Sequence, residues 1–336
     1  MEIRDVLHGS IEVESTELSI IDSRFFQRLR QIKQMGFAEL SYPSASHNRY
    51  IHSLGALSTA DKAFQAIFNH SPSSPFSHDR KKSTYTRFRS VLRLAALLHD
   101  VGHGPLSHTT EFAMPEVSDL KLPTKKTGRT KVRKATHEDY TLKIILDSDL
   151  TPLLEAAGKP YGFNAEHVAS LIDPSLDTED DFFRESIGGE TLDFRPLLRQ
   201  LISSEIDADR MDYLRRDSLN AGVSYGHFDF DWLVSNLTFH IYKGKCFLGL
   251  QNRALYAFED FLISRFHMFL MVYFHYKSVV YDEMLRQYFL SPDCDYVLPA
   301  QMDAYSKCTD AELFAHLSKS SNPWARRITE KNPIEC

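Results

Sequence analysis

The most constraining feature of this sequence is a stretch typical of a buried helix that runs directly into histidine, aspartate and glycine. Residues Phe88–Leu98 have the apolar density of such a helix. They are followed by His99-Asp100-Val101-Gly102-His103-Gly104-Pro105, in which the glycines allow sharp backbone turns. An imidazole beside a carboxylate at the end of a buried helix offers nitrogen and oxygen ligands to a divalent metal. A buried structural His–Asp pair is the alternative interpretation, but the nearby His103 and His108 favour a metal or catalytic site.

Hydrophobic periodicity elsewhere predicts a mainly α-helical protein with small β-hairpins. Apolar residues recur at helical spacing in segments 17–34, 53–68, 107–112, 137–145, 165–171, 197–203 and 207–216. Alternation around a turn predicts hairpins at Ile3–Val13 and Asn236–Gly249. The stretch Ala254–Leu290 has the pattern of one long helical region crowded with aromatic side chains, which is typical of a core or a subunit interface. We therefore expect a homo-oligomer.

Composition excludes several classes of protein. Hydrophobic residues make up 43% and charged residues 25% of the 336 positions, which is an ordinary globular balance. No segment approaches the roughly 18 consecutive apolar residues of a membrane span, and the charged start Met1–Asp5 is unlike a signal peptide. The four cysteines contain no CxxC pair, which fits a reducing compartment and argues against a thiolate metal site. These features predict a soluble cytoplasmic protein without a membrane partner.

The charge is unevenly distributed along the chain. The net charge is −6, from 39 basic and 45 acidic residues, so the chain as a whole offers no electrostatic case for binding nucleic acid. Positive charge is concentrated in two polar segments, which we interpret as basic insertions near 77–90 and 114–135. Five cations lie within Arg80–Arg89 and seven within Lys121–Lys134. A phosphate backbone is one partner that such segments fit, and a solvated surface loop is the other interpretation.

Three further motifs extend the His–Asp constellation along the chain. They are the segments Arg28–Gly36, Ser46–Gly55 and Glu205–Asp217. Together with His99–His108 they resemble the HD-domain metal-dependent phosphohydrolase superfamily, in particular its dNTP triphosphohydrolase branch. The resemblance covers most of residues 1–290 and implies a helical HD core. We expect residues 1–290 to form that domain and 291–336 a C-terminal helical extension, which either lacks the further lobe of longer relatives or is truncated.

The resemblance implies a divalent-metal site and catalytic residues. The implied metal ligands are His52, His99, Asp100 and Asp209. Nitrogen and oxygen donors without thiolate suit Mn, Fe, Zn, Ni or Mg. His137 matches the acid that protonates the leaving 5′ oxygen, and Glu111 stands where the family often has an aspartate that orients it. His103 and His108 resemble a pair that contacts the phosphates, although the gap from His108 to His137 is longer than the family's.

The same resemblance implies substrate-binding residues. Four match positions that hold the triphosphate: Arg49, Arg210, Tyr213 and Arg265. Two match positions that hydrogen-bond the sugar 3′-OH: Gln34 and Asp217. Two match positions that exclude a 2′-OH: Met35 and Tyr273. Arg210 replaces the more usual lysine, and Phe274 departs from the polar residues of some members, which leaves the base preference open.

The function implied by this resemblance is hydrolysis of dNTPs at the α-phosphorus, giving deoxynucleoside and inorganic triphosphate. Asp22, Gln27 and Arg30 match positions that bind a guanine-nucleotide activator between subunits in some members, but a capped helix with a solvated face explains them equally well. Two alternatives stay open. One is an HD phosphodiesterase or nuclease acting on single-stranded nucleic acid or a signalling nucleotide, and the other is a non-catalytic nucleotide sensor.

Overall fold

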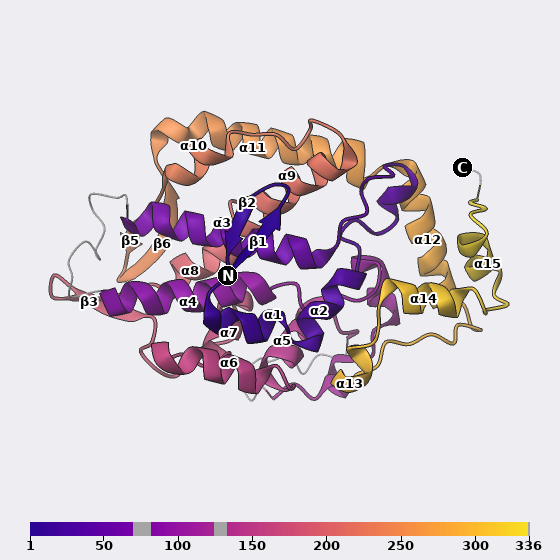
Figure 1. Cartoon of the computed structure of the whole chain (residues 1–336), viewed down its shortest axis with the longest axis horizontal. Coiled ribbons are helices and arrows are strands. Elements are labelled where there is room, and N and C mark those ends of the chain that lie inside the picture. The colour runs from indigo at the N-terminus through magenta and orange to yellow at the C-terminus, as the bar shows by residue number, and fades with distance from the viewer. Residues whose placement is uncertain (70–81, 124–132, 335–336) are drawn as a thin grey trace.

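The computed structural model describes residues 1–69, 82–123 and 133–334, and its architecture is mainly helical (Figure 1). This confirms the fold class predicted from the sequence. Of the two basic segments, residues 77–81 and 124–132 lie outside the described residues. No helix in the described part combines the length and apolar character that crossing a membrane requires.

Three helices form the centre of the molecule: α3 (Arg49–Asn69), α4 (Lys82–Leu98) and α9 (Ala208–Ala221). Helix α3 packs against both of the others, and Figure 1 shows it beside α4. The side chains of Leu92 and Leu97 on α4 are fully buried. A glycine allows the close approach of α3 to α9, because a Cβ on Gly55 would lie 2.0 Å from a carboxylate oxygen of Asp212. These contacts place the start of α3, the end of α4 and the start of α9 near one another.

Shorter helical segments surround this centre. Before α3 lie α1 (Ser15–Ile21), α2 (Arg24–Arg28), η1 (Leu29–Gln31) and η2 (Gly36–Leu40). Between α4 and α9 lie η4 (Ser107–Ala113), η5 (Val117–Leu120), α5 (His137–Leu146), α6 (Thr151–Gly158), η6 (Lys159–Tyr161), α7 (Ala165–Ile172) and α8 (Arg195–Ile202). After α9 follow α10 (Phe230–Ser235), η7 (Asn252–Ala254), α11 (Leu255–Met268), the π-helical turn η8 (Phe269–Tyr273), α12 (Tyr276–Leu290), α13 (Met302–Tyr305), α14 (Asp310–Leu317) and α15 (Pro323–Thr329).

The strands form two small sheets. The hairpin β1 (Glu2–Asp5) and β2 (Gly9–Glu12) is antiparallel. The second sheet has the order β3-β4-β6-β5, with strands β3 (Arg184–Ile187), β4 (Glu190–Asp193), β5 (Leu237–Tyr242) and β6 (Lys245–Leu250). Both predicted hairpins are confirmed, but the β3–β4 hairpin was missed. Its turn contains Gly188 and Gly189 at φ values of 62° and 90°, and this glycine pair is the signal that predicts such a turn.

Two segments predicted as continuous helices are interrupted. In 17–34, Ser23 separates α1 from α2, because its hydroxyl accepts a hydrogen bond from the backbone N–H of Phe26 and so caps a new helix. In 254–290, η8 ends at Tyr273, and the imidazole of His275 accepts from the backbone N–H of Lys277 at the start of α12. Figure 1 shows α12 turning away from the direction of α11. Hydrophobic periodicity does not reveal these breaks, since it continues across them.

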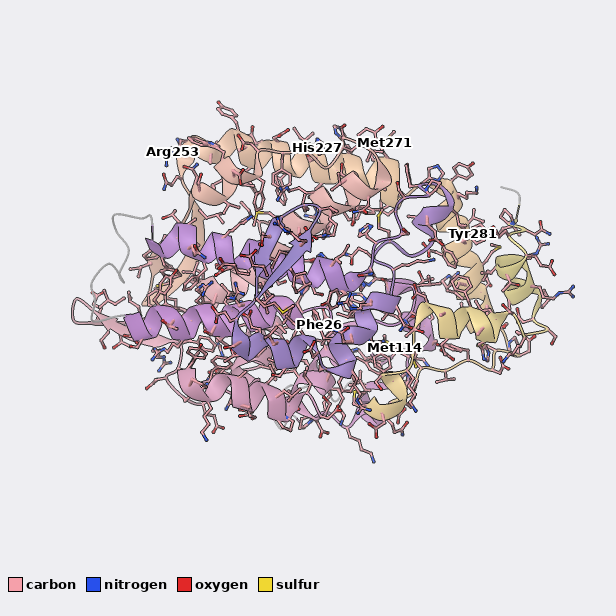
Figure 2. The ribbon with its side chains drawn as sticks, in the orientation of Figure 1. Phe26, Met114, His227, Arg253, Met271 and Tyr281 are labelled. Carbon is pink, nitrogen blue, oxygen red and sulfur yellow. The ribbon has the colours of Figure 1, made fainter. Side chains whose placement is uncertain are left out.

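The hydrophobic core extends through the helices that surround α3 and α4. In Figure 2 the side chains fill the spaces between the helices, and the labelled Phe26 of α2 lies in the interior. Its side chain is fully buried, and its ring centroid lies 5.1 Å from that of Tyr50 on α3. Met271 of η8, also labelled, is about half exposed. The N-terminal helices are therefore anchored to α3 by apolar packing, and α3 is held in position for the polar groups at its start.

Candidate metal centre and its cavity

Four side chains from three elements converge near the end of α4. His52 is on α3, His99 and Asp100 directly follow α4, and Asp209 is in the first turn of α9. Nε2 of His52 lies 3.0 Å from Oδ1 of Asp209 and 3.6 Å from Oδ2 of Asp100. Nε2 of His99 lies 3.4 Å from the same Asp209 oxygen and 3.5 Å from Oδ1 of Asp100. The structure thus brings together the four residues predicted as metal ligands.

The geometry of these donors fits a divalent metal. Nε2 of His52 and Nε2 of His99 are buried and have no hydrogen-bond partner. Donors arranged at right angles or tetrahedrally around an ion with bonds of ~2.1 Å are roughly 3.0 to 3.4 Å apart, and the two contacts of Asp209 have this spacing. Two imidazoles and two carboxylates without sulfur form a donor set that Mn, Fe, Zn, Ni or Mg accepts.

Hydrogen bonds on the far side of each ring orient the two imidazoles. Nδ1 of His99 donates to the carbonyl oxygen of Ala96 at 2.8 Å. Nδ1 of His52 donates to Oδ2 of Asp212 at 2.9 Å. A metal-ligating histidine usually donates its second ring N–H in this way, which leaves the lone pair on Nε2 for the metal. Both rings therefore have the tautomer and the orientation that a metal ligand needs.

Negative charge dominates the centre. Burial by itself would lower the pKa of His52, but the neighbouring carboxylates of Asp209 and Asp212 raise it to about 10. Burial by itself would raise the pKa of Asp209 and Asp100. The neighbouring imidazoles hold the pKa of both carboxyls below the usual range, and at Asp100 the guanidinium of Arg49 also lowers it. A site that keeps its carboxylates ionised and favours a proton on a buried imidazole also favours a metal cation.

Three histidines form a second cluster beside the metal centre. The ring of His103 stacks on that of His137 with centroids 3.8 Å apart, and the ring of His108 lies 4.8 and 4.9 Å from these two. Oε1 of Glu111 lies 2.5 Å from Nδ1 of His137 and 3.4 Å from Nδ1 of His108. Burial by itself would raise the pKa of Glu111, but these contacts lower it to about 2. Glu111 is therefore an ionised partner of His137.

The local sequence explains why His137 lies here despite its distance from His108 along the chain. Thr136 and Asp139 form a capping box that starts α5 at His137. The start of α5 rests on the turn after α4, where residue 102 has no side chain. A Cβ on Gly102 would lie 2.2 Å from the carbonyl oxygen of His137 and 2.2 Å from the backbone nitrogen of Thr141. The glycine therefore allows the contact that brings His137 to the cavity.

Gly102→Ala is expected to destabilise the protein by about 1 to 3 kcal/mol, the usual cost of overpacking. The neighbours of the added methyl group are backbone atoms of α5, which cannot move without shifting the helix. Urea unfolding at pH 7 measures the change. Gly249→Ala is the control, because its Cβ would lie 3.4 Å from the nearest atom. Equal stability of the two variants would contradict this account of the turn.

A cavity of about 430 Å³ adjoins both clusters. Its lining includes the carboxylates of the metal centre and the three clustered histidines, together with these predicted substrate-binding residues: Gln34, Met35, Arg49, Tyr213, Asp217 and Tyr273. Arg210 and Arg265 are not among the described residues that line it. Arg210 is paired with Asp207, and Nη1 of Arg265 lies 2.8 Å from Oε2 of Glu205. The phosphate contacts of these two arginines stay a prediction.

One wall of the cavity contains a buried chain of polar contacts. Nε2 of His47 lies 2.7 Å from Oδ1 of Asp217, and the hydroxyl of Tyr273 donates to Oδ2 of Asp217 at 2.8 Å. The Asp217 side chain is almost fully buried. Oε1 of Gln34, a residue of the same lining, is buried without a hydrogen-bond partner. This wall therefore offers fixed hydrogen-bonding groups to a polar part of a ligand.

The predicted activator residues are engaged in local contacts. Asp22 follows the end of α1. Nε2 of Gln27 donates to the carbonyl oxygen of Ile21 at 2.8 Å, and Nε of Arg30 donates to Oε1 of Gln27 at 2.8 Å. The guanidinium of Arg30 also lies over the ring of Tyr50, 3.6 Å from its centroid. A nucleotide-activator site at these residues stays a prediction.

Sequence motifs assign no role to three polar residues that the structure places at this site. Asp212 accepts a hydrogen bond from Nδ1 of His52. It lies three residues after Asp209, and because this spacing puts both side chains on one face of a helix, the sequence could have indicated that Asp212 lies near the metal centre. His8 contacts Asp212 from the N-terminal hairpin. Asp282 of α12 lines the cavity and accepts a hydrogen bond from the hydroxyl of Thr109 at 2.7 Å. Neither His8 nor Asp282 belongs to a motif, because each reaches the site from a distant segment.

Asp282→Asn is expected to stabilise the protein at pH 8 by on the order of 2 kcal/mol. Burial raises the pKa of Asp282 to about 6, although the Thr109 hydrogen bond and His108 oppose the rise. This pKa exceeds the unfolded value of 3.8, so between pH 3.8 and 6 the Asp282 carboxyl is protonated in the folded protein and ionised in the unfolded protein. The stability that comes from this protonated carboxyl is complete below pH 3.8 and is lost as the pH rises through 6. Urea unfolding should therefore show a gain at pH 8 that nearly vanishes at pH 4. An equal gain at both values would contradict the prediction, and exposed Asp231→Asn is the control.

Comparison with known proteins matches the segment that contains this centre. The HD domain family model matches residues 49–217, about half of the chain, and this range includes all four predicted metal donors. An uncharacterized protein of Methanocaldococcus jannaschii is 30% identical over 334 residues, which cover 98% of this chain and 58% of that protein. The deoxynucleoside triphosphate triphosphohydrolase SAMHD1 of Homo sapiens is 27% identical over 353 residues, which cover 96% of this chain and 51% of that protein.

A solved structure is similar over nearly the whole chain. It is the crystal structure of a hypothetical protein from Aquifex aeolicus, with a TM-score of 0.73 and 29% sequence identity. The match covers 98% of this chain and 75% of that one. The chain spans little more than half the length of the two curated relatives described above.

Proposed function

This chain belongs to the HD domain family, and on that premise we propose that it is a metal-dependent phosphohydrolase that converts dNTPs to deoxynucleoside and inorganic triphosphate. One observation carries the proposal: the two carboxylates of the metal centre, Asp100 and Asp209, line the same cavity as His137, which is paired with Glu111. The similarity to the human triphosphohydrolase over 96% of this chain supports dNTPs as the substrate class. We propose a cytoplasmic enzyme and a homo-oligomer.

A divalent metal held by His52, His99, Asp100 and Asp209 would polarise a phosphoryl oxygen and lower the pKa of water. Arg49 supplies a fixed positive charge beside this centre. Its guanidinium donates to Asp100 and, through Nε, to the hydroxyl of Ser107 at 2.8 Å, and its side chain is buried at the cavity. A guanidinium held in this way stabilises the charge of a phosphate without reorganising during the reaction.

His137 is placed to serve as the general acid. In the proposed reaction, the oxygen of water forms a bond to the α-phosphorus and releases a proton to solvent, the bond from that phosphorus to O5′ breaks, and His137 gives a proton to O5′. Glu111 holds Nδ1 of His137, so Nε2 is the nitrogen available to the substrate. The contact with Glu111 also fixes the orientation of the imidazole ring.

The wall that contains Asp217 fits the sugar of a nucleotide. Gln34 has a buried oxygen without a partner, and Asp217 has a fixed carboxylate, so both are available to a hydroxyl group. The hydroxyl of Tyr273 is hydrogen-bonded to Asp217, and this bond holds the ring of Tyr273 in the lining of the cavity. We propose that Tyr273 and Met35 exclude a ribose 2′-OH.

The test is product analysis by ion-exchange chromatography with each dNTP and the matching rNTP, in Mn²⁺, Fe²⁺ and Mg²⁺. The proposal expects equal amounts of deoxynucleoside and intact triphosphate, and little turnover of rNTPs. Protein treated with a chelator is the control, and its activity should return when the metal is restored. Diphosphate or orthophosphate as the first product would overturn the proposed site of cleavage.

The same samples distinguish the alternative functions. Cleavage of single-stranded oligonucleotides with no turnover of dNTPs would replace the proposal with a nuclease. Saturable dNTP binding without turnover in any metal would replace it with a nucleotide sensor. The oligonucleotide assay also tests the two basic segments, of which residues 77–81 and 124–132 lie outside the described structure.

A further inference from the structure

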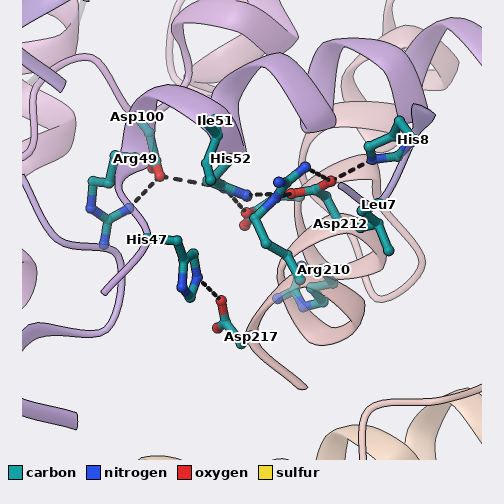
Figure 3. A network of polar contacts seen from close by, with 12 residues as sticks. Leu7, His8, His47, Arg49, Ile51, His52, Asp100, Arg210, Asp212 and Asp217 are labelled. Carbon is teal, nitrogen blue, oxygen red and sulfur yellow. Dashed lines mark hydrogen bonds and ion pairs between the residues drawn. The ribbon is translucent and has the colours of Figure 1, made fainter. Parts of the chain in front are cut away.

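The N-terminal hairpin reaches the metal centre through a buried carboxylate. Asp212 of α9 lies between α9 and α3, and its side chain has no exposed surface. Its Oδ2 accepts hydrogen bonds from Nδ1 of His52 at 2.9 Å and from Nε of Arg216 at 2.8 Å, and its Oδ1 accepts one from Nη2 of Arg216 at 3.0 Å. Nε2 of His8 lies 2.6 Å from its other oxygen, Oδ1. Figure 3 shows His8, Asp212 and His52 in one continuous network.

His8 is held in place by the turn of the hairpin. A carboxylate oxygen of Asp5 accepts hydrogen bonds from the backbone N–H groups of Leu7 at 2.9 Å and His8 at 2.8 Å. The other oxygen of Asp5 accepts from Nη1 of Arg216 at 2.7 Å. The His8 side chain is fully buried. Its partner Asp212 lies 204 residues away in the sequence. Two residues of the turn, Asp5 and His8, therefore bracket the Arg216–Asp212 pair.

The contacts of Asp212 decide which nitrogen of His52 faces the metal centre. Each Asp212 oxygen already accepts from Arg216, and a carboxylate in this position offers only acceptors. Nδ1 of His52 must therefore be the donor, and Nε2, which faces Asp209 and Asp100, is the nitrogen whose lone pair would bind a metal once its proton is displaced. Arg216 binds both oxygens of Asp212, and His8 adds a contact to Oδ1, the oxygen that His52 does not use.

We propose that Asp212 and His8 are positioning residues that orient His52 for divalent-metal binding, so that the N-terminal hairpin is a functional part of the metal centre. This inference rests on the metal site of the proposed function but not on its substrate. The competing account is that the network only attaches the hairpin to α9. That account predicts a loss of stability without a change in the metal affinity of folded protein.

The experiment measures Co²⁺ and Mn²⁺ binding to metal-free full-length protein by calorimetry, and the visible absorption spectrum of the Co²⁺ complex. Asp212→Asn should weaken metal binding by about 10- to 100-fold, the usual effect of changing a partner of a metal-bound histidine. His8→Ala should weaken it by roughly tenfold and alter the Co²⁺ spectrum. His8→Gln should recover most of the affinity, because its amide can still donate to Asp212.

Ser10→Ala is the matched control, because it removes a hydrogen bond of the same hairpin, from the hydroxyl of Ser10 to Glu2, at an exposed position. Urea unfolding of the metal-free variants reports stability separately. Should Asp212→Asn fail to fold, the two His8 variants decide the question. Unchanged metal affinity and an unchanged Co²⁺ spectrum in folded His8→Ala would overturn the inference, as would wild-type protein that binds neither metal. Wild-type protein that binds metal but hydrolyses no dNTP would refute the proposed function and leave this inference intact.

Discussion

Asp209→Asn is expected to lower the rate of dNTP hydrolysis by at least about a thousandfold and to abolish stoichiometric metal binding. Oδ1 of Asp209 lies near the unpartnered Nε2 atoms of both His52 and His99, at 3.0 and 3.4 Å. An amide preserves the shape of this side chain but removes the negative charge that holds a cation. A metal contributes several kcal/mol to the stabilisation of a phosphoryl transition state, and about 4 kcal/mol corresponds to a factor of a thousand in rate.

Elemental analysis of the purified variant and its turnover in excess Mn²⁺ measure the two parts of this prediction. Asp231→Asn on α10 is the control, since it removes an exposed aspartate on a helix that carries none of the metal donors. The control should retain both metal and activity. Full metal content together with normal turnover in Asp209→Asn would remove Asp209 from the set of metal ligands.

His137→Gln should lower kcat by roughly 10²- to 10⁴-fold, the usual contribution of a general acid, while the metal content stays unchanged. His137 is not among the four predicted donors, and its side chain contacts the rings of His103 and His108 and the carboxylate of Glu111. Glutamine keeps a polar side chain of similar length but cannot give a proton to O5′. Glu111→Gln should lower kcat less, because the proton donor remains and only its orienting charge is lost.

A change of leaving group separates this role from a structural one. A nitrophenyl ester needs no protonation of its departing oxygen, so His137→Gln should hydrolyse such a phosphate ester at close to the wild-type rate. Equal losses on the nitrophenyl ester and on dNTPs would show that His137 holds the cavity in shape and is not an acid. Because the pKa of Glu111 is lowered to about 2, its carboxylate stays ionised from pH 4 to 9, and no inflection near pH 4.5 is expected from it.

Much of the candidate site follows from residue types and spacing. The end of a buried helix at Leu98 places His99 and Asp100 at the edge of the core. The capping pair of Thr136 and Asp139 starts a helix at His137. These are local effects, in which the chain within a few residues decides the structure. They place two of the predicted metal donors, His99 and Asp100, at the end of a helix, whereas the full set of four was implied by the family resemblance. The domain division at residue 290 and the roles of the individual site residues stay predictions.

Other features depended on packing between distant segments. The pKa of Asp282 is raised because α12 is buried beside η4, and no pattern around Asp282 indicates that burial. Arg210 turns to Asp207 and Arg265 to Glu205, although both match positions of phosphate-binding residues. Side-chain directions of this kind depend on which charged partner lies within reach, and that partner is decided only when helices meet.

The sequence by itself therefore determined the helical class, because that class depends on short-range periodicity. Its motifs also showed a resemblance to the HD family, which implied nitrogen and oxygen donors for a metal. Tertiary structure decided the rest. It alone brings His8 to Asp212 across 204 residues, stacks His103 on His137, and forms a cavity lined by Asp100, Asp209 and the three clustered histidines. The physical reason is that tautomers and pKa values depend on burial and on contacts between distant segments. These arise only when the helices pack together, and the sequence of a single helix does not determine them.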